Sequence, residues 1–205
     1  MHLVSSSVVI DLPQADLEYW PQWLTPDCAN EWLEALVNET PWERPEIKLY
    51  GRSFKVPRLV AWYGDPEAHY RYSGLLHEPQ PWTLLLSQIR EQVQAQVGGH
   101  LNGVLLNLYR DGQDAMGWHS DDEPELGRNP VVASLNLGAA RRFDFRRKGA
   151  SRIEWSLELE HGSLLVMRGT TQHHWQHQIA RTRKVTEPRL NLTFRQLILR
   201  PPHEQ

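Results

Sequence analysis

The sequence predicts an α+β fold that is mainly β, in which two helices and an N-terminal strand extension pack on an antiparallel β-sandwich or jelly roll. Three observations lead to this prediction. Two segments before residue 100 repeat apolar residues every three to four positions, the chain after residue 100 is divided into short segments rich in β-forming residues, and turn residues separate those segments. Such a sandwich can hold a site between its two sheets.

The two predicted helices have recognisable starts. The first covers 25–40, where Thr25 or Asp27 can cap the first turn. The second covers 81–97, with Pro81 in its first turn and a pair of glycines after its end. Each helix has an apolar stripe that can pack on a core. The stripes are Trp32, Leu33, Leu36 and Val37, and Leu85, Ile89, Val93 and Val97.

Six segments after residue 100 predict the strands of the sandwich, because several of them alternate apolar and polar residues with period two. They are 103–110, 131–138, 141–147, 152–160, 163–169 and 189–199. Earlier in the chain, 45–75 is rich in Tyr, Arg, Pro and Gly, which predicts strands and loops. No repeat or low-complexity linker divides the chain. We therefore expect a single domain over 1–205, with an N-terminal extension over 1–100 and the jelly-roll core over 101–200.

The composition excludes several classes of protein. The single cysteine, Cys28, rules out an internal disulfide and any cysteine-based zinc site, and it is typical of a reducing compartment. The N-terminal stretch has no basic region, and no segment approaches the ~20 apolar residues of a membrane span. We therefore expect a cytoplasmic protein that does not enter the membrane, with a monomer as the default state.

The distribution of charge points towards nucleic acid more than the net charge does. The net charge of −3 argues weakly against a polyanionic partner, but basic residues are clustered and nine tryptophans are many for this length. The clusters expected to contact phosphates are Arg141, Arg142, Arg146, Arg147 and Lys148, and the run at 181–184. The alternative is that these basic runs are solvated faces and that the tryptophans fill the core.

The segment MGWHSDDE (116–123) places an imidazole and carboxylates close together. In an extended segment His119 and Asp121 point to the same side, which offers two ligands to a divalent metal. A second histidine would complete the two-histidine, one-carboxylate arrangement of non-haem Fe(II) oxygenases, which leaves coordination positions open. Spacing alone does not choose that histidine among His161, His173, His174 and His177.

Two segments carry polar side chains that could bind a dicarboxylate. Along a strand, Arg189 and Arg195 share a face with Asn191 and Thr193, and Asn107 shares a face with Tyr109. Cations and neutral donors in this number suit carboxylates. Six residues of strand span ~20 Å, so both arginines reach one small diacid only if they lean inward. Ordinary sheet pairing is the alternative for each residue.

The order and spacing of these blocks resemble the AlkB family of Fe(II)/2-oxoglutarate-dependent nucleic-acid dealkylases, in its DNA-repair branch. The resemblance covers most of 103–197. Its blocks are NLYRDGQDAMGWHSDDE (107–123), VASLNLGAARRFDFRRK (132–148), LEHGSLLVMRG (159–169), HHWQHQIARTRK (173–184) and PRLNLTFR (188–195). A weaker match, YGRSFKVPRLVAWYGD (50–65) and HYRYSG (69–74), extends it towards the N-terminus, whereas 1–24 carry little of it.

The resemblance implies a double-stranded β-helix (jelly-roll) core and assigns roles to single residues. His119, Asp121 and His177 would be the catalytic iron ligands, with His177 chosen because it precedes Arg189 by the family's spacing. Arg189 would hold the distal carboxylate of 2-oxoglutarate, and Arg195 would lie nearer the iron. The implied 2-oxoglutarate-binding set is Asn107, Tyr109, Arg189, Asn191, Thr193 and Arg195.

The activity implied by the resemblance is oxidative demethylation of N-alkylated bases of the 1-methyladenine and 3-methylcytosine type. The substrate would be alkylated DNA, with RNA as a further candidate, and Fe(II), O2 and 2-oxoglutarate would yield succinate, CO2 and formaldehyde. The target base must leave the stack, and a methylated adenine or cytosine is cationic.

Acidic and aromatic side chains near the metal would receive such a base. Asp122 or Glu123 would meet its charge, aromatic rings would stack on it, and Tyr50 would wedge into the duplex. The alternatives are loop solvation for the acids and core packing for the aromatics. The predicted substrate-binding set is Tyr50, Trp62, Tyr70, Tyr72, Ser73, Trp118, Asp122 and Glu123.

Two other functions remain open at this point. The same cofactors could serve a hydroxylase of a protein or a small molecule, although the basic clusters and the acidic pair argue against it. A lesion-binding module without turnover is the other alternative, but a pure binder has no use for open metal positions.

Overall fold

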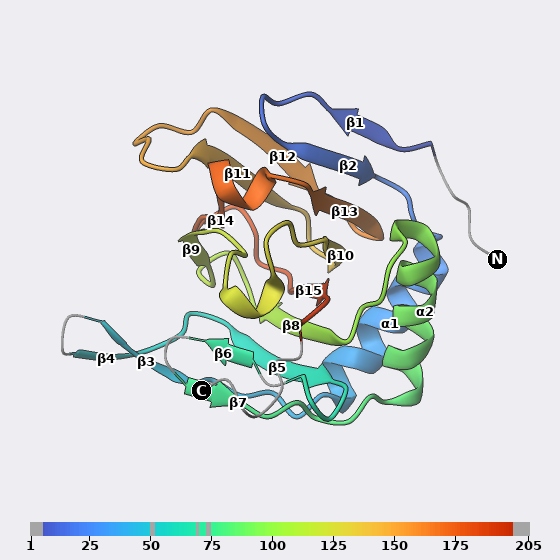
Figure 1. The fold of residues 1–205 in the computed structure, drawn as a ribbon. Helices are drawn as coiled ribbons and strands as arrows, with labels where there is room; N and C mark the ends of the chain where they lie inside the picture. The colour runs from blue at the N-terminus through green and yellow to red at the C-terminus, as the bar shows by residue number, and fades with distance from the viewer. Residues whose placement is uncertain (1–5, 50–51, 69, 73–74, 199–205) are drawn as a thin grey trace.

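The computed structural model describes residues 6–49, 52–68, 70–72 and 75–198. In this part of the chain, two antiparallel sheets form the jelly-roll sandwich (Figure 1). The major sheet has the strand order β1-β2-β13-β10-β15-β8-β5. Its strands are β1 (Val8–Ile10), β2 (Asp16–Trp20), β5 (Leu59–Gly64), β8 (Gly103–Tyr109), β10 (Val132–Gly138), β13 (Ser163–Arg168) and β15 (Arg189–Arg195).

The minor sheet lies against the major one and has the strand order β12-β11-β14-β9. Its strands are β9 (Met116–His119), β11 (Arg141–Arg147), β12 (Trp155–Leu159) and β14 (Trp175–Ile179). Two hairpins stand apart from both sheets. They are β3 (Glu46–Leu49) with β4 (Arg52–Lys55), and β6 (Tyr70–Tyr72) with β7 (Leu75–His77).

Helices α1 (Pro26–Glu39) and α2 (Leu84–Val97) cover the outer face of the major sheet (Figure 1). The short helices α3 (Thr171–His174) and η1 (Pro124–Leu126) lie in connections. The predicted cap of α1 is confirmed, because the Thr25 hydroxyl accepts a hydrogen bond from the Cys28 N–H at 3.4 Å. The predicted start of α2 was wrong. Thr83 caps that helix through the Leu86 N–H at 3.1 Å, so Pro81 precedes it.

The alternation in β15 separates the apolar core from the polar interior of the sandwich. Leu190, Leu192 and Phe194 pack with the helices in one cluster. The residues between them, from Arg189 to Arg195, turn to the opposite face of the strand and line a cavity. All seven residues of β15 are buried, so both faces of this strand are covered. The period-two pattern of the sequence predicted this division correctly.

The sheets also contain strands that the sequence analysis did not identify. β14 completes the minor sheet between β11 and β9, and β2 pairs with β13 in the major sheet. Because β2 and β5 belong to the same sheet as β8, the major sheet combines strands from both sides of residue 100. The predicted strand at 152–160 is shorter than expected and starts at Trp155.

A half-buried histidine in the turn before β13 is expected to make the stability of the fold depend on pH. His161 Nδ1 accepts a hydrogen bond from the Gly138 N–H at 2.8 Å, and Gly138 has a φ of +84°, where glycine is favoured. Burial lowers the pKa of His161 below its ordinary value. The folded state therefore keeps this imidazole neutral, whereas the unfolded chain takes up a proton near pH ~6.5. Stability is full above that pH and decreases as the pH falls towards the lower folded-state pKa.

The variant His161→Asn tests this pH dependence. An asparagine amide oxygen can accept the Gly138 hydrogen bond without titrating. Between about pH 8 and about pH 5.5, the melting temperature of His161→Asn is expected to fall less than that of the wild type. The exposed His173, changed to Asn, is the control and should keep the wild-type slope. Identical slopes for all three proteins would contradict the assignment.

Candidate active site between the two sheets

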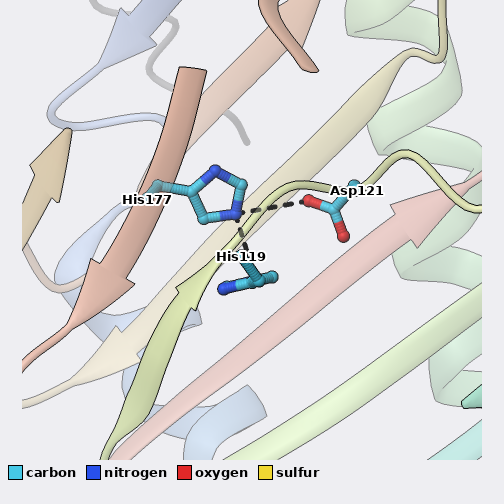
Figure 2. Close-up of side chains that lie close together, drawn as sticks. All are labelled: His119, Asp121 and His177. Carbon is cyan, nitrogen blue, oxygen red and sulfur yellow. Dashed lines mark hydrogen bonds and ion pairs between the residues drawn. The ribbon is translucent and has the colours of Figure 1, made fainter. Parts of the chain in front are cut away.

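Three side chains that are far apart in the sequence meet between the sheets (Figure 2). His119 ends β9, His177 lies in the middle of β14, and the two residues are cross-strand partners. The Nε2 atoms of His119 and His177 are 3.1 Å apart, and His177 Nε2 lies 3.4 Å from an oxygen of Asp121. The possible ligand atoms of the three residues all lie within 4.8 Å of one another. A single metal ion could therefore contact all three.

The predicted convergence of His119 and Asp121 is confirmed, but a continuous strand does not produce it. β9 ends at His119, and Asp121 follows in a bend. The buried amide of Gln172, in α3, accepts a hydrogen bond from the Asp121 N–H at 2.9 Å. The Ser120 hydroxyl donates to the Trp175 carbonyl oxygen at 2.8 Å. These contacts hold the bend so that the Asp121 carboxylate faces the histidines.

The protonation states of His119 and Asp121 suit a divalent cation. His119 Nδ1 lies 2.9 Å from the Gly117 carbonyl oxygen, so it carries the proton and Nε2 is free to bind a metal. Burial and the neighbouring His177 lower the pKa of His119 to about 3. Burial alone would raise the pKa of Asp121, but Arg195 and the histidines outweigh it and hold that pKa below its usual range. At neutral pH His119 therefore offers a neutral imidazole and Asp121 an ionised carboxylate.

A cavity beside this cluster contains every predicted 2-oxoglutarate-binding residue. Its lining combines the three metal-ligand candidates with apolar side chains such as Met116, Phe143 and Ile179. The polar part of the lining is Asn107, Tyr109, Ser134, Arg189, Asn191, Thr193 and Arg195. The Asn191 amide donates to the Ser134 hydroxyl at 2.8 Å, and the Thr193 hydroxyl donates to the Asn191 oxygen at 2.8 Å. The donors are therefore fixed in position.

The two arginines that line this cavity contact different groups. Arg195 donates to the Asp121 carboxylate and so lies beside the metal-ligand candidates. At the far end, Arg189 Nη2 donates to the Asn136 side-chain oxygen at 2.6 Å, and the guanidinium lies 5.0 Å from the centre of the Tyr109 ring. Burial lowers the pKa of Arg189 to about 10, so it remains cationic at neutral pH.

Arg189 has hydrogen-bonding capacity left for an anion. Its Nε and Nη1 are buried without a hydrogen-bond partner among the described residues. A buried cationic donor without a partner is costly unless a ligand completes its hydrogen bonds. The carboxylate of a diacid would complete the hydrogen bonds of this guanidinium.

A second cavity, of about 320 Å³, borders the cluster from another side. It shares Met116, His119, Asp121 and Arg195 with the first cavity. The rest of its described lining is Val56, Pro57, Arg58, Leu105, Ala115, Gly117, Trp118, Ser120 and Glu123. The metal-ligand candidates thus separate one cavity rich in carboxylate-binding groups from another that contains an acid and an indole.

The predicted substrate-binding residues have different environments. Glu123 and the half-buried Trp118 line the second cavity, and the Arg146 guanidinium lies 4.3 Å from the Trp118 ring. Asp122 is absent from that lining and forms an ion pair with Lys148 at 2.6 Å. Trp62 is buried in a core cluster with Leu105 and donates to the Ala68 carbonyl oxygen at 3.1 Å. Tyr70 and Tyr72 belong to β6, whereas Tyr50 and Ser73 lie outside the described residues.

The predicted phosphate-binding role of Arg141 was wrong. Its side chain is 2% exposed and donates to the carbonyl oxygens of Asp111, Asp114 and Ala180 at 2.7 to 3.1 Å. A buried guanidinium with these three carbonyl partners links the two segments that contain them. It does not reach a solvent-exposed phosphate. Arg181, Arg183 and Lys184 are exposed, so they stay candidates for such contacts.

Several polar residues of the site were not predicted from the sequence. Ser134 and Gln172 position other site residues, and Arg58 lines the second cavity. The alternation in WQHQI (175–179) could have revealed β14 and the inward direction of His177. No comparable signal marks Arg58 or Gln172, because their roles depend on contacts with distant segments.

Comparisons with known proteins agree with this geometry. Residues 16–195 match a family model described as the 2OG-Fe(II) oxygenase superfamily. The human protein "Alpha-ketoglutarate-dependent dioxygenase alkB homolog 3" is 40% identical over 174 residues, which cover 80% of this chain and 59% of that protein. The Mus musculus protein "DNA oxidative demethylase ALKBH2" is 40% identical over 160 residues, which cover 75% of this chain and 67% of that protein.

A solved structure supports the fold. The chain described as "The structure of OsALKBH1" has a TM-score of 0.64 and 17% identity, and the match covers 92% of this chain and 100% of that one. The chain spans about 59 to 63% of the length of the alkB homolog 3 relatives that it matches. In the described part of the structure no helix is long and apolar enough to cross a membrane. From the family model and the identity to these relatives, we conclude that the chain belongs to the AlkB family of Fe(II)- and 2-oxoglutarate-dependent dioxygenases.

Proposed function

We propose that this protein oxidatively demethylates N-alkylated bases of the 1-methyladenine and 3-methylcytosine type in DNA, using Fe(II), O2 and 2-oxoglutarate. The observation that supports it best is that two chemically different cavities meet at one metal-ligand cluster. Relatives at 40% identity are named as a dioxygenase that depends on alpha-ketoglutarate and as a DNA oxidative demethylase.

In this proposal His119, Asp121 and His177 bind the iron, and the first cavity binds 2-oxoglutarate. Bound iron would supply a site for dioxygen and for the chelating end of the co-substrate. Dioxygen would be the oxidant: one of its oxygen atoms would enter succinate as 2-oxoglutarate loses CO2, and the other would hydroxylate the N-methyl group. Arg189 binds the distal carboxylate, and Arg195 neutralises the Asp121 carboxylate beside the metal. The apolar side chains Met116, Phe143 and Ile179 limit the entry of water.

The second cavity receives the flipped base, with its N-methyl group towards the metal ligands. Glu123 faces this cavity and favours a base that carries positive charge, while Trp118 contributes apolar surface. The hydroxymethyl product then releases formaldehyde and leaves the repaired base. Extrusion from the stack costs a few kcal/mol, and less for a lesion that has already lost its pairing.

The activity is tested by following two products together. The iron-loaded protein is incubated with 2-oxoglutarate and with oligonucleotides that carry 1-methyladenine or 3-methylcytosine, and both succinate and repaired base are measured. Both products are expected. Succinate without repair would favour a hydroxylase of a protein or a small molecule, and tight oligonucleotide binding with neither product would favour a lesion binder. Parallel DNA and RNA oligonucleotides decide which polymer is preferred.

We further propose that the protein acts as a monomer in the cytoplasm. The metal-ligand candidates His119, Asp121 and His177 gather within one chain, which is consistent with a monomer. The free, half-buried Cys28 is consistent with a reducing compartment. Light scattering during gel filtration measures the oligomeric state directly.

The two acidic residues after the metal-binding segment are expected to differ in importance. Glu123→Gln removes the charge that faces the base, so kcat/KM for 3-methylcytosine should fall about 10-fold or more, the equivalent of a charge-assisted hydrogen bond of ~1.5–3 kcal/mol. Asp122→Asn breaks only the exposed ion pair with Lys148, which contributes ~0–1 kcal/mol to stability. The kcat/KM of this variant for 3-methylcytosine should therefore stay close to that of the wild type.

A neutral lesion provides the control for this comparison. The loss in Glu123→Gln should be smaller for 3-methylthymine, because no positive charge is then stabilised. An equal loss for the charged and the neutral lesion would show that Glu123 acts through the shape of the cavity and not through its charge.

A further inference from the structure

Arg58 lies between the two cavities and contacts a residue of each. It precedes β5, and its side chain is only 3% exposed. Its Nε donates to the Asn107 side-chain oxygen at 2.7 Å, and its Nη1 donates to the Ala115 carbonyl oxygen at 3.4 Å. Arg58 lines the second cavity, whereas Asn107 lines the first. The Arg58–Asn107 hydrogen bond therefore crosses the wall between them.

This hydrogen bond determines which way the Asn107 amide points. A guanidinium has only donors, so the Asn107 atom that faces it must be the oxygen. The NH2 group is then directed away from Arg58, and Asn107 reaches the cavity that holds Arg189 and Arg195. If the Asn107 amide were flipped, its NH2 group would face the Arg58 N–H in a buried site. The Asn107 oxygen, a hydrogen-bond acceptor, would then face the first cavity. A carboxylate ligand requires the donor.

We propose that Arg58 is a positioning residue for co-substrate binding, which holds the amide of Asn107 with its NH2 group directed towards the carboxylate of 2-oxoglutarate. The proposal rests on the function proposed above for the first cavity. It gives Arg58 a role independent of nucleic acid, although its side chain borders the cavity assigned to the base. Because the Asn107 oxygen is engaged, the amide is prepared before the co-substrate enters, and little ordering is left to the binding step.

A double-mutant cycle on 2-oxoglutarate affinity tests this proposal. The dissociation constant is measured by calorimetry on the Mn(II)-loaded protein, without nucleic acid, for the wild type, Arg58→Gln, Asn107→Ala and the double variant. Arg58→Gln and Asn107→Ala should each weaken binding by about 3- to 10-fold, which corresponds to one hydrogen bond. The double variant should bind no more weakly than Asn107→Ala alone, because Arg58 acts through Asn107.

Two further variants distinguish a positioning role of Arg58 from a general loss of protein stability. Arg58→Lys keeps a cationic donor and should recover part of the affinity. Asn107→Asp can still accept from Arg58, so its melting temperature should stay at or above that of the wild type. It offers the carboxylate no N–H group, so its 2-oxoglutarate affinity should fall by about 10-fold or more.

The outcomes that would overturn the proposal are distinct from failure of the proposed function. Unchanged affinity in Arg58→Gln, additive losses in the double variant, or full affinity in Asn107→Asp would each refute the positioning role. A wild-type protein that binds 2-oxoglutarate but repairs no lesion would instead refute the proposed substrate and leave the role of Arg58 intact.

Discussion

His177→Ala is expected to lower both succinate formation and base repair by more than about 100-fold. Substituting a residue that only hydrogen-bonds to a metal ligand already costs ~10–100-fold in metal affinity or activity, and His177 is itself a ligand candidate. His177 is 3% exposed, and its Nε2 faces both His119 and Asp121. Without this imidazole, two ligand candidates remain, and the affinity for the metal should fall with the activity.

The fold of this variant should survive, because the substituted side chain makes few contacts that the sheets need. Its Nδ1 has no hydrogen-bond partner among the described residues, and its ring packs on Phe143 with the centroids 4.9 Å apart. Metal binding is measured by calorimetry with Mn(II), and folding by thermal melting. The exposed His173 is the matched control, and His173→Ala should keep full activity. Wild-type turnover by His177→Ala would remove this residue from the site.

Arg189→Met should have opposite effects on co-substrate binding and on the stability of the free protein. Loss of the charge-assisted hydrogen bonds to the distal carboxylate, worth ~1.5–3 kcal/mol, should weaken 2-oxoglutarate binding by about 10- to 150-fold. In the protein without co-substrate, Arg189 Nε and Nη1 have no hydrogen-bond partner among the described residues. An apolar side chain of similar length should therefore leave the melting temperature unchanged or raise it.

Thermal melting with and without 2-oxoglutarate measures both effects. The wild-type protein should gain stability as the co-substrate concentration rises, and Arg189→Met should gain little over the same range. Arg142, whose guanidinium pairs with Asp144 outside the two cavities, is the control, and Arg142→Met should keep the wild-type response. A 2-oxoglutarate response of wild-type size in Arg189→Met would place the distal carboxylate elsewhere.

Much of the fold follows from local patterns. The apolar stripes predicted both helices, and the period-two alternation predicted that Arg189, Asn191, Thr193 and Arg195 share a face, which the cavity lining confirms. These patterns report which side of an element is apolar, because side-chain direction repeats with a fixed period in helices and strands. They do not report which strand pairs with which. Hence β14 and its pairing with β9 were missed.

The residue identities alone predicted that the His119 imidazole and the Asp121 carboxylate face the same side, and that one strand carries arginines and neutral polar side chains on a single face. Residue spacing left the second histidine open and the family resemblance implied His177, whereas the tertiary structure brings His177 beside His119 through the pairing of β9 with β14. The tertiary structure also distinguished Glu123 at the cavity from Asp122 at the Lys148 ion pair. It showed that the buried Arg141 side chain donates to backbone carbonyl oxygens and that Arg58 donates to the Asn107 side chain. The physical reason is common to all of these cases: each role depends on contacts between segments far apart in the chain, whereas periodicity and spacing describe only neighbours along it.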